Sequence, residues 1–128
     1  MSIDLTLLLW SAALTLLQCV IAVLGAMSQV GLTALAGNRD HLPAIEGWAG
    51  RAQRAHRNML ESLVLFAVLV LVAHVSGRAN SMTALGAELF FGARLVYVPV
   101  YLLGIPWVRT GVWAISVLGL ILIFVQTV

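Results

Sequence analysis

Residues 50 to 62, GRAQRAHRNMLES, contain three arginines, an asparagine and a glutamate directly before the apolar run LVLFAVLVLVAHV. On a helix that turns about 100° per residue, the polar side chains fall within an arc of about 80°: Arg51, Arg54, Asn58 and Glu61. Arg57 borders this stripe, whereas His56 lies on the other side of the helix and should face a different environment. Guanidinium groups bind carboxylates through paired hydrogen bonds, so the stripe could hold a small anion.

A second polar stripe lies further along the chain, where Arg94, Tyr97 and Tyr101 share one helical face. A charge inside a bilayer costs at least about 2.5 to 3.5 kcal/mol, so such residues normally face a bundle interior or a watery cavity. The two stripes therefore predict one shared cavity, with cations at its mouth, hydrogen-bonding groups in its middle and aromatic rings beside it. It suits a small anionic ligand that meets an apolar partner arriving from lipid.

Two alternatives to ligand binding remain open for these charges. The arginines at the start of the first stripe could be topological anchors that reach lipid headgroups. Glu61 and Arg94 both lie well inside their helices, and we expect them to form a structural ion pair in preference to contacting a ligand directly.

Other chemistry is poorly supported. His41 and His74 are isolated and have no metal-ligand spacing, so no metal is expected. No Ser/His/Asp order, phosphate-binding glycine loop or redox cysteine pair occurs, and Cys19 is the single cysteine. The formal charge of +2 is too small and scattered for a nucleic-acid surface, so no nucleic-acid partner is expected.

Composition indicates the elements that must position the stripes. The 128 residues are 62% hydrophobic and 9% charged, with a mean hydropathy of +1.04, which identifies an integral membrane protein. Because backbone in lipid must satisfy its own hydrogen bonds, the apolar stretches should be helices. We predict an all-α, single-domain protein over residues 1–128, an antiparallel bundle of four transmembrane helices at about 5–36, 52–76, 81–103 and 107–126.

Helix starts and orientation can also be predicted. Asn80 or Ser81 can cap the third helix, and Pro106 suits the entrance to the fourth. Most arginines fall in or near the first and third links, which we therefore expect at the cytoplasmic surface, with both termini on the opposite side of the membrane.

The motifs carry a family resemblance. RAQRAHRNMLES resembles the helix 2 signature of the MAPEG family, the membrane-associated proteins in eicosanoid and glutathione metabolism, in which arginines precede an Asn with an acidic residue three positions later. GARLVYVPVYLLGIPWVRTGVW is similar to that family's helix 3 and the entrance to helix 4. Helix number, short loops and motif order agree over nearly the whole chain, and the chain looks like a bacterial-type member.

The resemblance implies a homotrimer in a bacterial inner membrane, with glutathione held between neighbouring subunits near the cytoplasmic face. The resemblance implies that Arg109 faces the glutathione thiol, whereas the sequence alone allows equally that Arg109 is a cytoplasmic topology anchor. A guanidinium beside the thiol would favour the thiolate, which is the nucleophile. The other implied glutathione-binding residues are Arg51, Arg54, Arg57, Asn58, Glu61, Arg94, Tyr97, Tyr101 and Thr110.

Departures from the family pattern leave two functions open. Gly31 stands where prostaglandin-synthesising members carry an arginine, Gly50 where they carry an acidic residue, and Tyr97 where some have histidine. The leading hypothesis is a glutathione-dependent membrane transferase or peroxidase that acts on apolar electrophiles. The alternative is a non-catalytic scaffold or lipid-binding subunit with the same fold. A small transporter or channel is weaker, because the helices lack internal symmetry.

Overall fold

The computed structural model describes all 128 residues and contains only helices. They are α1 (Ile3–Val30), α2 (Leu32–Ala36), α3 (Gly47–Val75), α4 (Ser81–Leu102) and α5 (Pro106–Thr127). All except α2 are long and apolar enough to cross a membrane. The expected all-α membrane protein with four transmembrane helices is confirmed.

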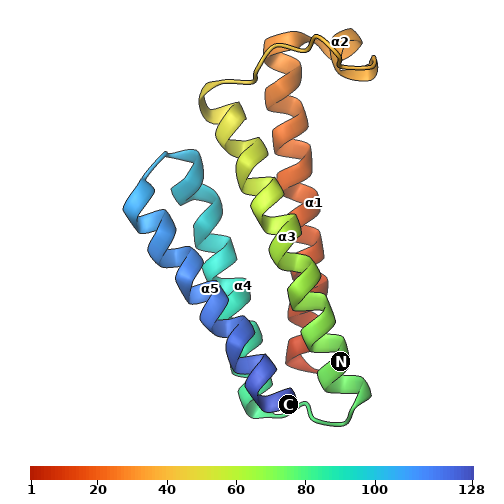
Figure 1. The fold of residues 1–128 in the computed structure, drawn as a ribbon, viewed down its shortest axis with the longest axis vertical. Helices are drawn as coiled ribbons and strands as arrows, with labels where there is room; N and C mark the ends of the chain where they lie inside the picture. Colours follow the sequence, from red (N-terminus) through yellow and green to blue (C-terminus); the bar gives the residue numbers. More distant parts are fainter.

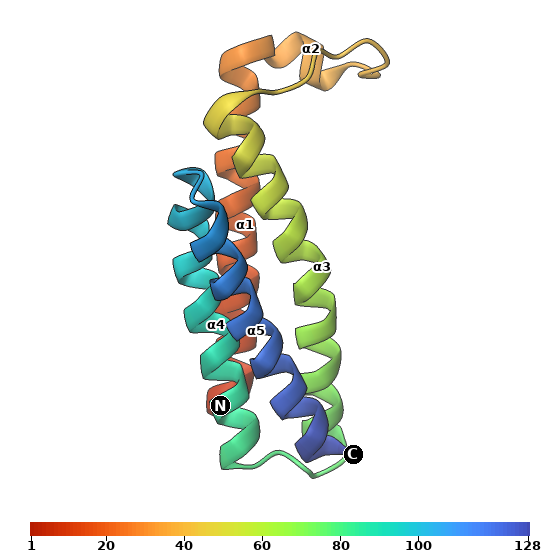
Figure 2. The ribbon, with the colours of Figure 1, turned by 60° about the vertical axis from the view of Figure 1, so that its left-hand side comes forward.

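The four long helices form two antiparallel pairs, α1 with α3 and α4 with α5 (Figure 1). Both termini lie at one end of the bundle, and α2 projects sideways at the other end (Figures 1 and 2). α4 and α5 pack closely because glycines lie at their contact. A Cβ on Gly119 would lie 2.5 Å from the carbonyl oxygen of Gly86.

The helix expected over residues 5–36 is not continuous. Gly31 has φ +85° and ψ 161°, a conformation that L side chains rarely adopt, and it ends α1. The five residues of α2 then run across the end of the bundle instead of extending α1 (Figure 2). This break places α2 beside α1 and α3, where residues of all three helices line one cavity.

α3 begins at Gly47, five residues before the expected start at residue 52. The side chain of Gln29 holds this start in place, because its Nε2 donates to the Glu46 carbonyl at 2.8 Å and its Oε1 accepts from the Glu46 N–H at 3.0 Å. A Cβ at Gly50 would lie 2.5 Å from the Ile45 carbonyl oxygen. A side chain at position 50 would therefore collide with the backbone in this conformation.

The remaining helix ends agree with the sequence. The Asn80 side chain accepts from the N–H groups of Met82 and Thr83, and Thr83 Oγ1 accepts from the Asn80 N–H, which completes a capping box. Pro106 is the first residue of α5, where its missing N–H leaves no hydrogen bond unmade.

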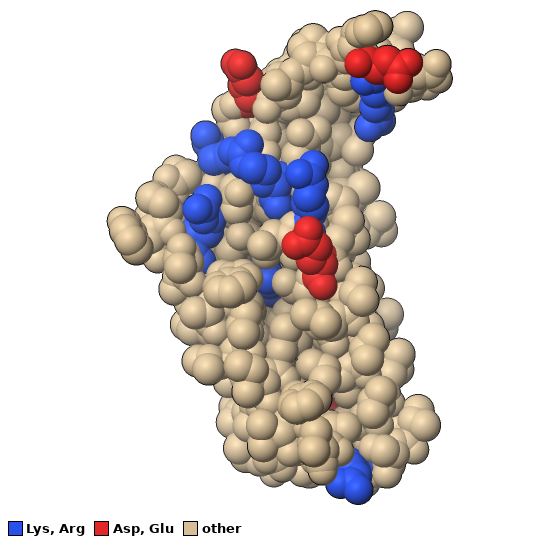
Figure 3. All heavy atoms as spheres, viewed as in Figure 1, with Lys and Arg blue, Asp and Glu red and all other residues tan.

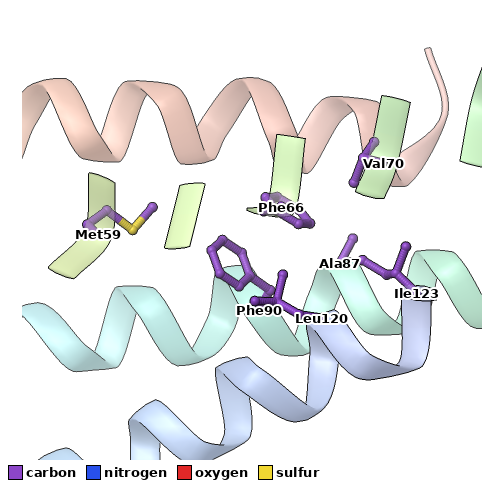
Figure 4. Close-up of a cluster of buried hydrophobic side chains, with 7 residues drawn as sticks. All are labelled: Met59, Phe66, Val70, Ala87, Phe90, Leu120 and Ile123. Carbon is purple, nitrogen blue, oxygen red and sulfur yellow. The ribbon is translucent and has the colours of Figure 1, made fainter. Parts of the chain in front are cut away.

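The apolar core joins α3, α4 and α5 toward the end that holds the termini (Figure 4). The rings of Phe66 and Phe90 stack with centroids 4.2 Å apart. The complete cluster is Met59, Phe66, Val70, Ala87, Phe90, Leu120 and Ile123. Beyond it, Asp4 Oδ1 pairs with His74 Nε2 at 2.8 Å, while Asp4 Oδ2 accepts from Thr83 Oγ1 at 3.3 Å, so these residues tie three helices together. The core also fixes the rotation of α3 and α4 where their polar stripes begin.

Candidate functional site

Arg94 is the most deeply buried charge in the chain, with 1% of its surface exposed. Its Nη1 donates to Asn58 Oδ1 at 2.7 Å, and its Nη2 donates to Ser62 Oγ. Ser62 Oγ also donates to the Asn58 carbonyl at 3.1 Å. The polar stripes of α3 and α4 therefore meet in the bundle interior, as the sequence predicted.

The expected ion pair between Glu61 and Arg94 is absent, and Glu61 is exposed. The reason is helical geometry: Asn58 and Ser62 lie about 40° apart on the face toward α4, whereas Glu61 lies about 60° beyond Asn58, away from Ser62. Neutral hydrogen-bond acceptors, not a carboxylate, therefore surround the buried guanidinium. Its positive charge is not cancelled within the chain.

Two tyrosine rings link the three arginines of the site. The Arg94 guanidinium lies 4.8 Å from the centroid of the Tyr97 ring, and the Arg109 guanidinium lies 4.7 Å from that of Tyr101. The two ring centroids are 5.4 Å apart. Arg54 Nε donates to the Tyr101 hydroxyl at 3.3 Å. These cation–π contacts and the hydrogen bond orient cations on α3, α4 and α5 around one aromatic pair.

A cavity of about 250 Å³ opens beside these rings. Its polar lining includes Arg54 and Asn58 from α3 and Arg109 from α5. The full lining is Arg54, Asn58, Tyr97, Tyr101, Arg109, Thr110 and Trp113. No carboxylate lines it, so the cavity has a positive potential. Basic side chains gather on this face toward the end where α2 lies (Figure 3).

Four of the predicted site residues do not line this cavity, and buried Arg94, which adjoins it, is one of them. Arg51 Nε donates to the Leu102 carbonyl at 2.9 Å and so satisfies the last turn of α4. Arg57 lines a second cavity on another side of α3, and Glu61 faces outward. Thr110 does line the cavity, but its hydroxyl donates to the Pro106 carbonyl at 3.1 Å.

Two residues of the site, Ser62 and Trp113, were not predicted from the sequence. Ser62 follows Asn58 by four positions, which places both on one face of α3. Ser62 could therefore have been predicted from the same helical spacing that grouped the polar stripe. Trp113 follows Arg109 by four positions on α5 in the same way. No group of three or more His, Cys, Asp or Glu side chains could hold a metal ion.

The chain was compared with models of known protein families. The family model described as MAPEG family matches residues 5–128. The chain belongs to the MAPEG family. No curated protein and no solved structure matches it. This MAPEG chain is accordingly an integral membrane protein of the kind found in glutathione and eicosanoid metabolism, and the family expected from its motifs is confirmed.

Proposed function

We propose that this MAPEG protein is a glutathione-dependent membrane transferase or peroxidase that acts on apolar electrophiles. The single observation that supports it best is the aromatic cavity that carries Arg54 and Arg109, adjoins buried Arg94 and contains no carboxylate. Glutathione carries two carboxylates and a thiol, and a site of this charge fits all three groups in their anionic forms.

The three arginines at or beside the cavity would have different roles in binding glutathione. Arg54 keeps its two terminal nitrogens free while Nε is held by Tyr101, so its guanidinium can pair with a ligand carboxylate in a fixed orientation. Arg94 donates one hydrogen bond from each Nη, to Asn58 and to Ser62, while its buried Nε has no partner, and it does not line the cavity, so it would act through the field of its unneutralised charge.

Arg109 is the residue we propose for the thiol. It is half-buried, stacks on Tyr101 and lines the cavity beside Thr110. A free thiol has a pKa of about 8.5, and a guanidinium at this position favours its deprotonated form. The glutathione thiolate would form a thioether with an electrophilic carbon, either by addition or by displacing a leaving group. With a peroxide it would attack one oxygen and break the O–O bond, giving an alcohol and a glutathione sulfenic acid, which a second glutathione would convert to the disulfide and water. Trp113 gives the cavity an apolar wall against which such a partner can pack.

We further propose the assembly and orientation that this function needs. A cavity open on one side of a single chain suits a ligand that a neighbouring subunit covers, which supports a homotrimer with glutathione between subunits. Arginine placement supports an orientation with the α2 end cytoplasmic and both termini on the other side, and the resemblance to bacterial-type members supports a bacterial inner membrane.

Isothermal titration of the purified protein with glutathione tests the proposal. We expect saturable heat from the wild type and at least tenfold weaker binding by Arg54→Ala, which loses a charged hydrogen-bonding partner of about 1.5 to 3 kcal/mol. Arg78→Ala is the matched control, because Arg78 lies at the opposite end and donates to the Val128 carbonyl at 3.2 Å. No heat above buffer at millimolar glutathione would remove the proposal.

The alternative is a non-catalytic scaffold or lipid-binding subunit. It is favoured by Gly31, which has no side chain to contact a ligand, and by Gly50, where a side chain cannot fit. A chromogenic electrophile separates the two functions. The enzyme requires wild type to conjugate glutathione faster than Arg109→Ala, and equal background rates for both proteins would favour the scaffold.

A further inference from the structure

A second cavity lies between α1 and α3, below α2, and the proposed glutathione site does not include it. Its volume is about 450 Å³, within the range of ligand pockets in proteins. Nine of its 13 lining residues are hydrophobic. Ala22, Ala26 and Met27 of α1, Leu35 of α2 and Leu60 of α3 form much of its wall. We call this cavity the α1–α3 groove.

The groove and the polar cavity use different faces of α3. Gln53, His56 and Leu60 line the groove and centre on a direction about 150° from that of Arg54 and Asn58, which line the polar cavity. His56 was expected to face a different environment from the polar stripe of α3, and it lines the α1–α3 groove. A molecule in the groove would therefore bind on the other side of α3 from the proposed thiol site.

The groove has a cationic rim and no acidic lining residue. Arg57 makes no hydrogen bond or ion pair within the chain. Arg39 adopts φ 65°, a left-handed conformation uncommon for a residue other than glycine, and its Nε donates to the Leu35 carbonyl at 2.7 Å. This bond turns the guanidinium back over the groove and leaves its terminal nitrogens free. Asp40 is next in sequence but forms no ion pair with it.

We propose that the α1–α3 groove binds one phospholipid with an anionic headgroup. Arg39 and Arg57 would hold the phosphate, with His56 beside them, and an acyl chain would lie along Ala26 and Leu35. The choice of occupant follows from charge, because two free guanidiniums at a membrane surface attract an anionic headgroup. A zwitterionic lipid would match the apolar wall equally well but would leave the positive rim without a compensating net charge.

Cys19 reports on the groove directly, because it is the only cysteine, is partly exposed and lines the groove. The experiment measures the rate at which N-ethylmaleimide labels Cys19 in the detergent-solubilised protein, with phosphatidylglycerol or phosphatidylcholine added. At a phosphatidylglycerol concentration about ten times its Kd, occupancy should slow labelling roughly tenfold. Phosphatidylcholine at the same concentration should give little protection.

Charge-removing variants test the headgroup contacts. Arg39→Gln with Arg57→Gln should abolish the protection by phosphatidylglycerol, whereas Arg78→Gln, which removes one arginine at the opposite end, should retain it. Native mass spectrometry should find phosphatidylglycerol retained by wild type and Arg78→Gln and lost from the double variant. Because neither readout involves glutathione, failure here is distinct from failure of the proposed enzyme.

Three results would overturn the proposal. Equal protection by both lipids would mean that the rim does not select a headgroup, and unchanged labelling with either lipid would mean that the groove stays empty. Protection without added lipid that increases with protein concentration would mean that a second copy of the chain covers the groove. Unfolding midpoints of the variants within the error of wild type would show that lost protection does not reflect lost folding.

Discussion

The bond between Arg94 and Asn58 allows the sharpest test of how the site is built. Asn58→Ala removes the 2.7 Å acceptor of a guanidinium that is 1% exposed. A hydrogen bond to a charged group contributes about 1.5 to 3 kcal/mol, and Arg94 has no carboxylate that could replace Asn58. Asn58→Ala should therefore lower the free energy of unfolding by about that amount in the wild type.

The same change should have a much smaller effect once the charge is gone. In an Arg94→Met background there is no guanidinium to leave unpaired, so Asn58→Ala should alter the free energy of unfolding by less than about 0.5 kcal/mol. The cycle formed by the two single variants and the double variant thus predicts a coupling of about 1.5 to 3 kcal/mol. That coupling corresponds to roughly 10- to 150-fold in the unfolding equilibrium.

Titration of micellar protein with sodium dodecyl sulfate, followed by the fluorescence of the four tryptophans, measures each corner of the cycle. Glu61→Gln combined with Arg94→Met is the matched control, because Glu61 is exposed and makes no ion pair with Arg94. Its effects should add to within about 0.5 kcal/mol. Additive effects for Asn58, or an equal coupling for Glu61, would refute this account of the buried charge.

Three further predictions concern packing, capping and chemistry. Gly119→Ala, whose Cβ would lie 2.5 Å from the Gly86 carbonyl oxygen, should destabilise the α4–α5 pair by about 1 to 3 kcal/mol. Gly92→Ala, whose Cβ would meet no other group within 4 Å, should in the same titration be neutral or stabilise by up to about 1 kcal/mol, because alanine is the better helix former. Asn80→Ala removes a side chain that accepts two backbone N–H groups and should cost about 1 kcal/mol; an unchanged midpoint would contradict the capping role. Arg109→Ala should move the pH profile of glutathione conjugation upward by about one pH unit or more, and an unmoved profile would exclude Arg109 as the thiolate stabiliser.

The four membrane spans could be predicted because long, mostly apolar runs leave backbone in lipid no alternative to helix. Local chemistry also placed the starts of α4 and α5, at the Asn80 cap and at Pro106. The break at Gly31 could not be predicted, since a lone glycine in an apolar run is compatible with an uninterrupted helix. Its φ of +85° accompanies α2 lying across the end of the bundle, which is a tertiary arrangement.

The site could be predicted in part for a related reason. Angular spacing groups residues on one face of a helix, and it correctly grouped Arg54 with Asn58 and Arg94 with the two tyrosines. It does not give the rotation of one helix against its neighbour. That rotation decides that Arg94 reaches Asn58 and Ser62 instead of Glu61, and that Arg57 faces the α1–α3 groove instead of the polar cavity.

A density map of the protein in lipid nanodiscs with saturating glutathione tests the central claim most directly, because it reports ligand position and subunit number together. The account predicts glutathione in the polar cavity, with a carboxylate on Arg54 and the sulfur beside Arg109. A well-resolved map with that cavity free of glutathione, or with glutathione bound away from α3, α4 and α5, would contradict it.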